Sequence, residues 1–165
     1  MLDPPVSGPA RQLDPAALGD HVDRLYRAAW ALCGSREDAE DLVQETFAKV
    51  LVKPRFLRND DDLGYLLRVL RNTHISRLRA AGRRPVGVPF PEEAPEPEDG
   101  RTAWRPDAAL DVDLLFTLIA VDVVGLSYGE AAKALGTKEA TITSRLYRAR
   151  AQVARGMDPS RQGVI

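Results

Sequence analysis

The sequence predicts an all-α protein of two small helical domains joined by an acidic, proline-rich linker. Apolar residues recur at helical spacing through most of the 165 residues. No segment of useful length shows the alternation of apolar and polar residues that is typical of a β-strand. The segment 85–106, PVGVPFPEEAPEPEDGRTAWRP, breaks this pattern with proline and acidic residues. We therefore expect a flexible N-terminus (1–13), a first domain (14–84), an extended linker (85–107), a helix-turn-helix domain (108–157) and a flexible tail (158–165).

The composition excludes several classes of protein. The one cysteine, Cys33, cannot form an internal disulfide and is expected to be a small buried apolar residue. No apolar run approaches the roughly 20 residues of a membrane span, and the start of the chain lacks a signal peptide pattern, so we expect a cytoplasmic protein. No phosphate loop, metal-ligand cluster or nucleophile arrangement is present, so we expect no independent enzyme, no cofactor and no metal.

Two helices open the first domain. The first is predicted from about Pro15 to Leu32, and Gly34 ends it. Its inner face carries Leu18, Val22, Leu25, Ala29 and Cys33. The second begins at Ser35, which can cap it while Asp38 reaches back, and runs to about Lys53. Its inner stripe is Ala39, Leu42, Val43, Thr46, Phe47, Val50 and Leu51, and its exposed acidic face is Glu40, Asp41, Gln44 and Glu45.

The third helix of this domain carries arginine on its outer face. It begins after three acids, residues 60–62, which suit a helix N-terminus, and it ends at Gly82. The residues expected to face inward are Leu63, Leu66, Leu67, Leu70, Leu78 and Ala81, with His74 partly buried. The residues on the opposite side are Arg68, Arg71, Asn72, Ile75 and Arg79.

The run 126–153, LSYGEAAKALGTKEATITSRLYRARAQV, has the pattern of a helix-turn-helix. Ser127 and Glu130 stand at capping-box spacing, and Gly136 ends the first helix. The second opens near Lys138. Its apolar stripe is Ile142, Leu146, Ala149 and Val153, and its polar face is Thr141, Ser144, Arg148 and Arg155. This geometry fits a DNA major groove, although two-helix hairpins also serve other roles.

Charge is segregated along the chain although the net charge is only −1. Residues 37–45 hold five acids and no base, and residues 63–84 hold six arginines and no acid. Eight acids face two arginines in residues 91–113, and six bases face two acids in residues 126–155. Blocks of this kind indicate two contacts with a polyanion and one with a basic protein.

Two pairs of motifs resemble a known family. DAEDLVQETF (38–47) and GYLLRVLRNTHISRLR (64–79) resemble region two of the extracytoplasmic-function (ECF) sigma factors of bacterial RNA polymerase, in the sigma-70 family. GLSYGEAAKALG and TSRLYRARAQV resemble their region four. The resemblance implies an alternative-type sigma factor that binds core RNA polymerase, recognises minus-ten and minus-thirty-five promoter elements, and melts promoter DNA for transcription initiation. It also implies an anti-sigma factor as a partner.

The resemblance assigns roles to three sets of residues. The residues that it implies for core polymerase binding are Asp38, Asp41, Gln44 and Glu45. Those implied for the minus-ten element are Arg55, Phe56, Arg58, Asn59, Arg68, Arg71, Asn72 and Arg79. Those implied for the minus-thirty-five element are Lys138, Glu139, Thr141, Thr143, Ser144, Arg145 and Arg148. Stacking on Phe56 and phosphate contacts by arginine suit these roles chemically.

Several alternatives stay open at this point. Phe56 can stack on a base or anchor its loop, and Tyr147 and Arg150 can pack or contact the DNA backbone peripherally. The segment 110–116, LDVDLLF, departs from the polar start usual for region four, so Leu114 to Phe116 are expected to form an additional apolar surface. A sigma-like decoy or adaptor, binding polymerase or an anti-sigma factor without reading DNA, is the alternative function. A dimeric repressor is disfavoured because no dimerisation helix remains.

Overall fold

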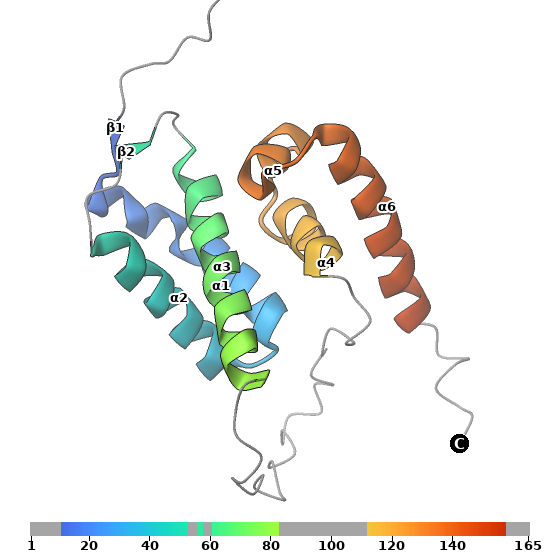
Figure 1. Cartoon of the computed structure of the whole chain (residues 1–165), viewed down its shortest axis with the longest axis horizontal. Coiled ribbons are helices and arrows are strands. Elements are labelled where there is room, and N and C mark those ends of the chain that lie inside the picture. Colours follow the sequence, from blue (N-terminus) through green and yellow to red (C-terminus); the bar gives the residue numbers. More distant parts are fainter. Residues whose placement is uncertain (1–10, 53–55, 58–60, 83–111, 158–165) are drawn as a thin grey trace, which may run out of the picture.

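The computed structural model describes residues 11–52, 56–57, 61–82 and 112–157. Its helices form two groups, α1 to α3 and α4 to α6, which lie side by side (Figure 1). The elements are β1 (Arg11–Gln12), η1 (Pro15–His21), α1 (Val22–Cys33), α2 (Arg36–Leu51), β2 (Phe56–Leu57), α3 (Asp62–Gly82), α4 (Val112–Leu118), η2 (Ile119–Val123), α5 (Tyr128–Leu135) and α6 (Glu139–Gly156). The all-α prediction is confirmed, while the predicted linker and tail fall outside or at the limits of the described residues.

The chain enters the first group through a 3-10 helix and not through one continuous α-helix as predicted. Asp14 caps η1 by accepting a hydrogen bond from the Ala16 amide (2.9 Å), and α1 then follows and ends at Gly34, whose φ is 70°. The change of helix type turns Val22 outward, so it is 39% exposed and not part of the inner face. Cys33 is only half-buried, and this burial raises the pKa of its thiol to about 11.

Ser35 caps α2 as its position predicted. Its hydroxyl accepts from the Asp38 amide (3.2 Å) and donates to the Asp38 carboxylate (2.7 Å). The predicted inner stripe is largely buried, and the Thr46 hydroxyl donates to the Leu42 carbonyl (2.7 Å). Leu51 is the exception at 54% exposed, because α2 ends at this residue, short of the predicted Lys53.

The long helix α3 packs a row of leucines against α1 and α2. Asp61 caps it by accepting from the Gly64 amide (2.9 Å), and Leu66, Leu67 and Leu70 are fully buried. The predicted inward positions near its end are wrong: Leu78 is 52% exposed and Ala81 is exposed, since they lie beyond the buried leucine row.

A short antiparallel β-pair, β1 with β2, belongs to the first group. Gln12 pairs with Phe56 and Arg11 with Leu57 in an antiparallel ladder that the sequence did not predict. Arg11 also forms an ion pair with Asp62, and the neighbouring Leu13 is buried. The expected flexible N-terminus of residues 1–13 is therefore wrong for its last three residues, because they pair and pack.

The second group is a helix-turn-helix built on α4 and a π-helical turn, η2. Both hydrogen bonds of the predicted capping box are present: Ser127 Oγ accepts from the Glu130 amide (3.2 Å), and Glu130 Oε2 accepts from the Ser127 amide (2.7 Å). Gly136, with φ at 65°, turns the chain between α5 and α6.

The start of this group corrects another expectation. Leu114, Leu115 and Phe116 are 4%, 6% and 0% exposed, so they do not form an additional apolar surface. They pack inward because α4 lies against α6 and α5, and η2 lies against α1.

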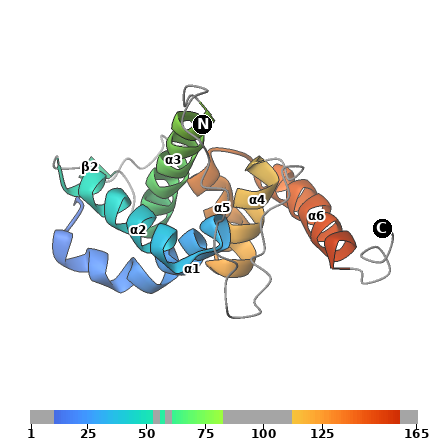
Figure 2. The same ribbon diagram turned by 90° about the horizontal axis from the view of Figure 1, so that it is seen from below.

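The two groups share one connected apolar core. Buried residues of α1 to α3 and of α4 to α6 belong to a single cluster, and α5 packs along α3. Figure 2 shows α4 and α5 between α3 and α6 in the turned view. Across the described ranges, no helix combines the length and apolar character that crossing a bilayer requires.

Candidate nucleic-acid and partner interfaces

The acidic face of α2 is largely open to solvent. Asp38, Asp41 and Gln44 are exposed, while Glu45 is partly buried. The Glu45 carboxylate lies 3.0 Å from Lys49 Nζ and accepts from Arg77 Nε at 2.7 Å. Its hydrogen bond with Lys49, with a further contribution from Arg77, holds the pKa of Glu45 below its usual value. Three of the four predicted partner-binding side chains are thus available, and the fourth is held by two cations.

The arginine face of α3 is divided between solvent and the second helix group. Asn72 and Arg79 are exposed, as predicted. Arg68 is also exposed, but it reaches across to α5, where its Nε donates to the Ala134 carbonyl (3.0 Å) and its Nη2 to the Lys133 carbonyl (2.7 Å). These carbonyls lie at the C-terminal end of α5, the negative end of the helix dipole, which favours a cation.

Arg71 makes the second contact from α3 to the other group. Its Nη2 donates to Asp113 Oδ1 (2.8 Å), and its guanidinium lies 5.5 Å from the centre of the Phe116 ring. His74, one turn along α3, meets the same ring edge-on at 6.2 Å between centroids. Burial, with a smaller effect of Arg77, lowers the pKa of His74.

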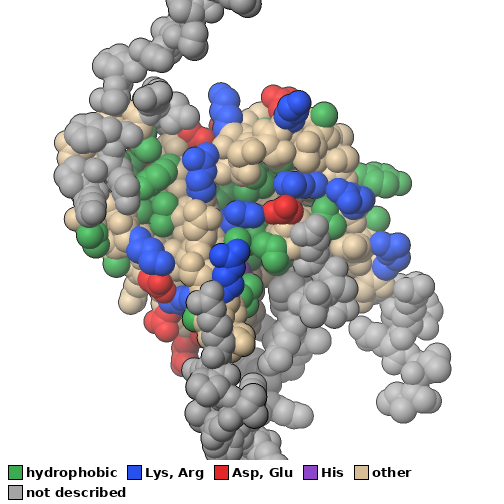
Figure 3. All heavy atoms as spheres, viewed as in Figure 1, with side chains coloured by type: hydrophobic (Ala, Val, Ile, Leu, Met, Phe, Trp, Pro, Cys, Tyr) green, Lys and Arg blue, Asp and Glu red, His purple; other side chains and the backbone are tan. Residues whose placement is uncertain are grey.

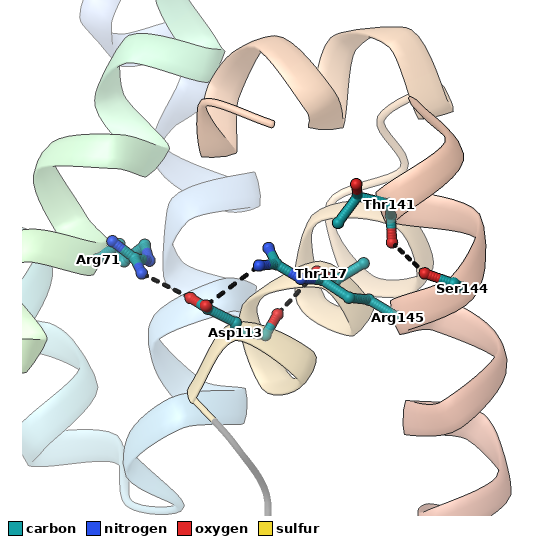
Figure 4. A network of polar contacts seen from close by, with 6 residues as sticks. All are labelled: Arg71, Asp113, Thr117, Thr141, Ser144 and Arg145. Atoms are coloured by element: carbon teal, nitrogen blue, oxygen red, sulfur yellow. Dashed lines mark hydrogen bonds and ion pairs between the residues drawn. The ribbon is translucent and has the colours of Figure 1, made fainter. Parts of the chain in front are cut away.

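Asp113 also binds the helix α6. Its Oδ2 accepts from Arg145 Nη2 at 3.2 Å, so one carboxylate lies between an arginine of α3 and an arginine of α6 (Figure 4). The Thr117 hydroxyl donates to the Asp113 carbonyl (2.7 Å) within α4. Figure 3 shows Lys and Arg side chains across this face, with an acidic side chain among them.

The remaining residues predicted for the minus-ten element belong to the sequence segment before α3. Phe56 is in β2, where its backbone pairs with Gln12. Arg55, Arg58 and Asn59 fall outside the described residues. The β-pair therefore ties this segment to the entry of the first helix group.

On α6 most of the predicted DNA-facing side chains are exposed. Those exposed are Lys138, Glu139, Thr143, Ser144 and Arg148. Thr141 is half-buried, and Arg145 is turned toward Asp113 with 22% of its side chain exposed. The Thr143 and Ser144 hydroxyls donate to the Glu139 and Thr141 carbonyls, both at 3.1 Å, which leaves their oxygens as acceptors.

Two other residues of α6, Tyr147 and Arg150, differ in their surroundings. Tyr147 is 78% exposed and does not pack in the core. Arg150 makes two hydrogen bonds to Asp122 (3.0 and 2.6 Å) and lines a groove of about 350 Å³ with Tyr128 and Tyr147. The pair with Asp122 raises the pKa of Arg150.

Sequence reasoning missed the role of Asp113. It lies in the segment that departs from the usual start of region four, and it was counted only as one acid of a block. Its partners lie 42 and 32 positions away along the chain, so no local spacing could have indicated them.

Comparison with known proteins accounts for both helix groups. The model of sigma-70 region 2 matches residues 18–84, and the model of sigma-70 region 4 matches residues 117–153. The ECF sigma factor SigM of Mycobacterium tuberculosis is 30% identical over 141 residues, which cover 82% of this chain and 72% of SigM. The chain belongs to the ECF sigma factors. The helix-turn-helix is thus region 4, and the helices α1 to α3 form region 2.

Other relatives agree with this placement. The ECF sigma factor SigE of Mycolicibacterium smegmatis is 36% identical over 146 residues, covering 81% of this sigma factor and 57% of SigE. A solved structure of the sigma factor RpoE with the anti-sigma factor NepR from Bartonella quintana is similar with a TM-score of 0.59. It is 27% identical and covers 87% of this chain and 96% of that one. CnrH, solved with the cytosolic domain of CnrY, shares the fold with a TM-score of 0.57 at 22% identity.

Proposed function

We propose that this protein directs core RNA polymerase to a two-part promoter and helps to open it. The observation that carries the proposal is the exposed acidic face of α2, located in sigma-70 region 2, on the same chain as a region 4 helix-turn-helix. A specificity subunit needs one surface for polymerase and separate surfaces for DNA. The charge segregation of the chain supplies both.

The proposed polymerase-binding residues are Asp38, Asp41, Gln44 and Glu45. Carboxylates that share one helix face attract a basic partner surface and speed the encounter, an effect that salt weakens. Asp38 and Asp41 are exposed and can pair with such a partner without first breaking an interhelical ion pair. Glu45 must exchange or share its contacts with Lys49 and Arg77.

Binding at the minus-ten element is proposed for the segment before α3 and for the outer face of α3. The residues are Arg55, Phe56, Arg58, Asn59, Arg68, Arg71, Asn72 and Arg79. Arginine side chains neutralise phosphates, and an aromatic side chain can hold an unstacked base. Capture of that base offsets the few kcal/mol that unstacking costs, so strand opening needs no catalytic residue.

Binding at the minus-thirty-five element is proposed for α6. The residues are Lys138, Glu139, Thr141, Thr143, Ser144, Arg145 and Arg148. The first turns of a recognition helix approach base edges, where arginine reads guanine and hydroxyl groups bind phosphate. The exposure of most of these side chains supports this role.

An anti-sigma factor is the proposed regulatory partner, and the cytoplasm is the proposed location. RpoE, which is similar over most of this chain, was solved in complex with an anti-sigma factor. Regulatory proteins of this family work with the polymerase rather than as enzymes, and we propose the same division of labour here: RNA synthesis belongs to the polymerase.

Reconstituted transcription tests the proposal. The purified chain is mixed with bacterial core RNA polymerase, and association is followed by gel filtration before transcription from a genomic promoter library. We expect a stable complex and initiation at a restricted set of promoters that share two elements. Failure to associate with core polymerase would refute the proposal. Association without promoter-specific initiation would instead favour a decoy or adaptor, an alternative to which the internal contacts of Arg68, Arg71 and Arg145 lend some support.

A further inference from the structure

The contacts of α3 with the second helix group, and one contact within that group, use side chains that the proposed function needs for DNA. Arg68 and Arg71 belong to the proposed minus-ten surface, and Arg145 belongs to the proposed minus-thirty-five surface. All three donate hydrogen bonds to atoms of region 4 or of α4 just before it. The N–H groups that make these hydrogen bonds cannot at the same time bind phosphate.

Asp113 is the centre of this arrangement. Arg71 approaches one of its oxygens from α3, and Arg145 approaches the other from α6 (Figure 4). A carboxylate held by two guanidinium groups presents to each the same kind of anionic oxygen that a DNA phosphate presents. The Asp113 side chain is 40% exposed, so a competing phosphate can approach the same two arginines.

We propose that Asp113 acts as an internal phosphate mimic that keeps regions 2 and 4 closed on each other until DNA replaces it. The proposal rests on the proposed DNA-binding role of α3 and α6. Arg68 supports the closed state from a second point, because it caps the C-terminal end of α5 through two carbonyls. Phe116 supports it from a third, since it lies fully buried under Arg71 and beside His74.

The closed state lowers the apparent affinity of the free chain for DNA. Only the open fraction presents Arg68 and Arg71 of α3 to DNA, so the apparent dissociation constant is divided by that fraction. Because the Arg71–Asp113 pair, the one of the two that joins α3 to the second helix group, is partly exposed, we expect its loss to lower the closed-to-open ratio by about twofold to fivefold. DNA affinity should rise by the same factor while the closed state predominates.

The test compares two isosteric variants of the full chain, Asp113→Asn and Asp122→Asn. Both remove one negative charge from the second helix group, but Asp122 pairs with Arg150 inside that group and not across the junction. Dyes are attached at Ala80→Cys and Ala154→Cys, two exposed positions on α3 and α6, in a Cys33→Ala background. Energy transfer reports closure, and fluorescence anisotropy reports binding to a duplex of about 30 base pairs of arbitrary sequence.

We expect lower transfer efficiency and severalfold tighter DNA binding for Asp113→Asn than for Asp122→Asn, which should keep the wild-type transfer efficiency. Asp113→Glu, which retains the charge, should stay closer to wild type. Equal transfer efficiency in wild type and Asp113→Asn would overturn the proposal, as would equal DNA affinity of the two Asn variants. If Asp113→Asn does not fold, Arg71→Gln removes the same ion pair between α3 and α4 from its other side. Transfer efficiency below that of wild type in this variant would support the proposal, and a wild-type value would overturn it.

These outcomes are separate from those that test the function. A chain that stays equally compact in all variants yet supports promoter-specific initiation refutes the internal mimic and leaves the sigma factor role intact. A chain that opens when Asp113 is neutralised but never associates with core polymerase refutes the proposed function.

Discussion

The fold leaves the acidic face of α2 largely open to solvent, but it engages part of the arginine-bearing faces of α3 and α6 in internal contacts. Asp38, Asp41 and Gln44 on α2 face solvent. Arg68, Arg71 and Arg145 are held by backbone carbonyls and by Asp113. The proposed polymerase surface is thus exposed before any partner arrives, whereas part of the proposed DNA surface has first to exchange its contacts.

This difference gives a physical order of events for a specificity subunit. Polymerase can bind an exposed face at little conformational cost, while DNA must compete with contacts inside the chain. On our proposal, a sigma factor built in this way binds DNA more weakly while it is free. Two features of the molecule produce this difference, the buried junction between regions 2 and 4 and the exposure of α2. Each can be changed by mutation without changing the other.

The junction should give the largest effect. Phe116 is 0% exposed and lies in the core that joins the two groups. We expect Phe116→Ala to lower the free energy of unfolding by about 3 to 5 kcal/mol, because it leaves a cavity under Arg71 and His74. Urea unfolding followed by circular dichroism measures this. Tyr147→Ala, at a position 78% exposed, is the control and should change stability by less than about 0.5 kcal/mol. A cost below about 1 kcal/mol for Phe116→Ala would argue against a shared core.

The exposed face of α2 comes next. We expect Asp41→Arg to weaken binding to core RNA polymerase by about tenfold or more, equivalent to about 1.4 kcal/mol, because a cation replaces an anion opposite a basic partner surface. Titration of the polymerase with fluorescently labelled protein measures the affinity. Asp23→Arg makes the same charge change at an exposed position of α1 and should bind nearly as wild type. Equal weakening of polymerase binding by both variants would indicate an effect of overall charge. It would contradict the assignment of the α2 face as the polymerase-binding surface.

The capping box of region 4 should give a smaller effect confined to the helix-turn-helix. Ser127→Ala removes the hydroxyl that accepts from the Glu130 amide, at an expected cost of about 1 kcal/mol. The hydrogen bond with the Ser127 backbone, which lowers the pKa of Glu130, remains possible in this variant. Thermal denaturation measures the cost, with Ser144→Ala on the exposed face of α6 as the control, expected within about 0.5 kcal/mol. A larger loss for Ser144→Ala than for Ser127→Ala would contradict the assignment of the cap.

The smallest expected effect is a dependence of stability on pH at the junction. Burial, with Arg77 nearby, lowers the pKa of His74 below that of the unfolded chain, so the folded state favours the neutral ring. This contribution is present above the usual histidine pKa of about 6.5 and is lost as the pH falls from there through the lowered pKa of the folded state. Urea unfolding at a series of pH values should show a shallower decline for His74→Leu than for His21→Leu, which leaves His74 in place. Identical profiles would exclude His74 as the titrating group.

Local signals in the sequence predicted the helix boundaries well. Ser35 and Ser127 cap α2 and α5, Gly34 and Gly136 take positive φ after α1 and α5, and Asp61 caps α3. Each of these devices acts over three or four residues, so spacing alone is enough to indicate it. Exposure of Asp41 and Gln44 on α2 followed from periodicity for the same reason, whereas Glu40 and Glu45 of the predicted exposed face are partly buried.

Errors arose where a residue's surroundings come from a distant part of the chain. Periodicity placed Leu78 and Ala81 inside, but the buried leucine row of α3 ends before them. It also left Leu114 to Phe116 as a surface, although α6 and α5 cover them. The β-pair of residues 11–12 with 56–57 is too short to produce an alternating pattern.

The sequence by itself determined the helical class, the main caps and turns, and the segregation of acidic and basic helix faces, because all of these depend on residues within a few positions of one another. Only the tertiary structure decided which charges are available. Arg68, Arg71 and Arg145 find partners 66, 42 and 32 positions away, and no local pattern contains such distances. The packing of region 4 on region 2 brings Arg68 and Arg71 to their partners, and the packing of α4 on α6 brings Asp113 to Arg145. Three arginines of a predicted DNA surface thus become contacts of the fold.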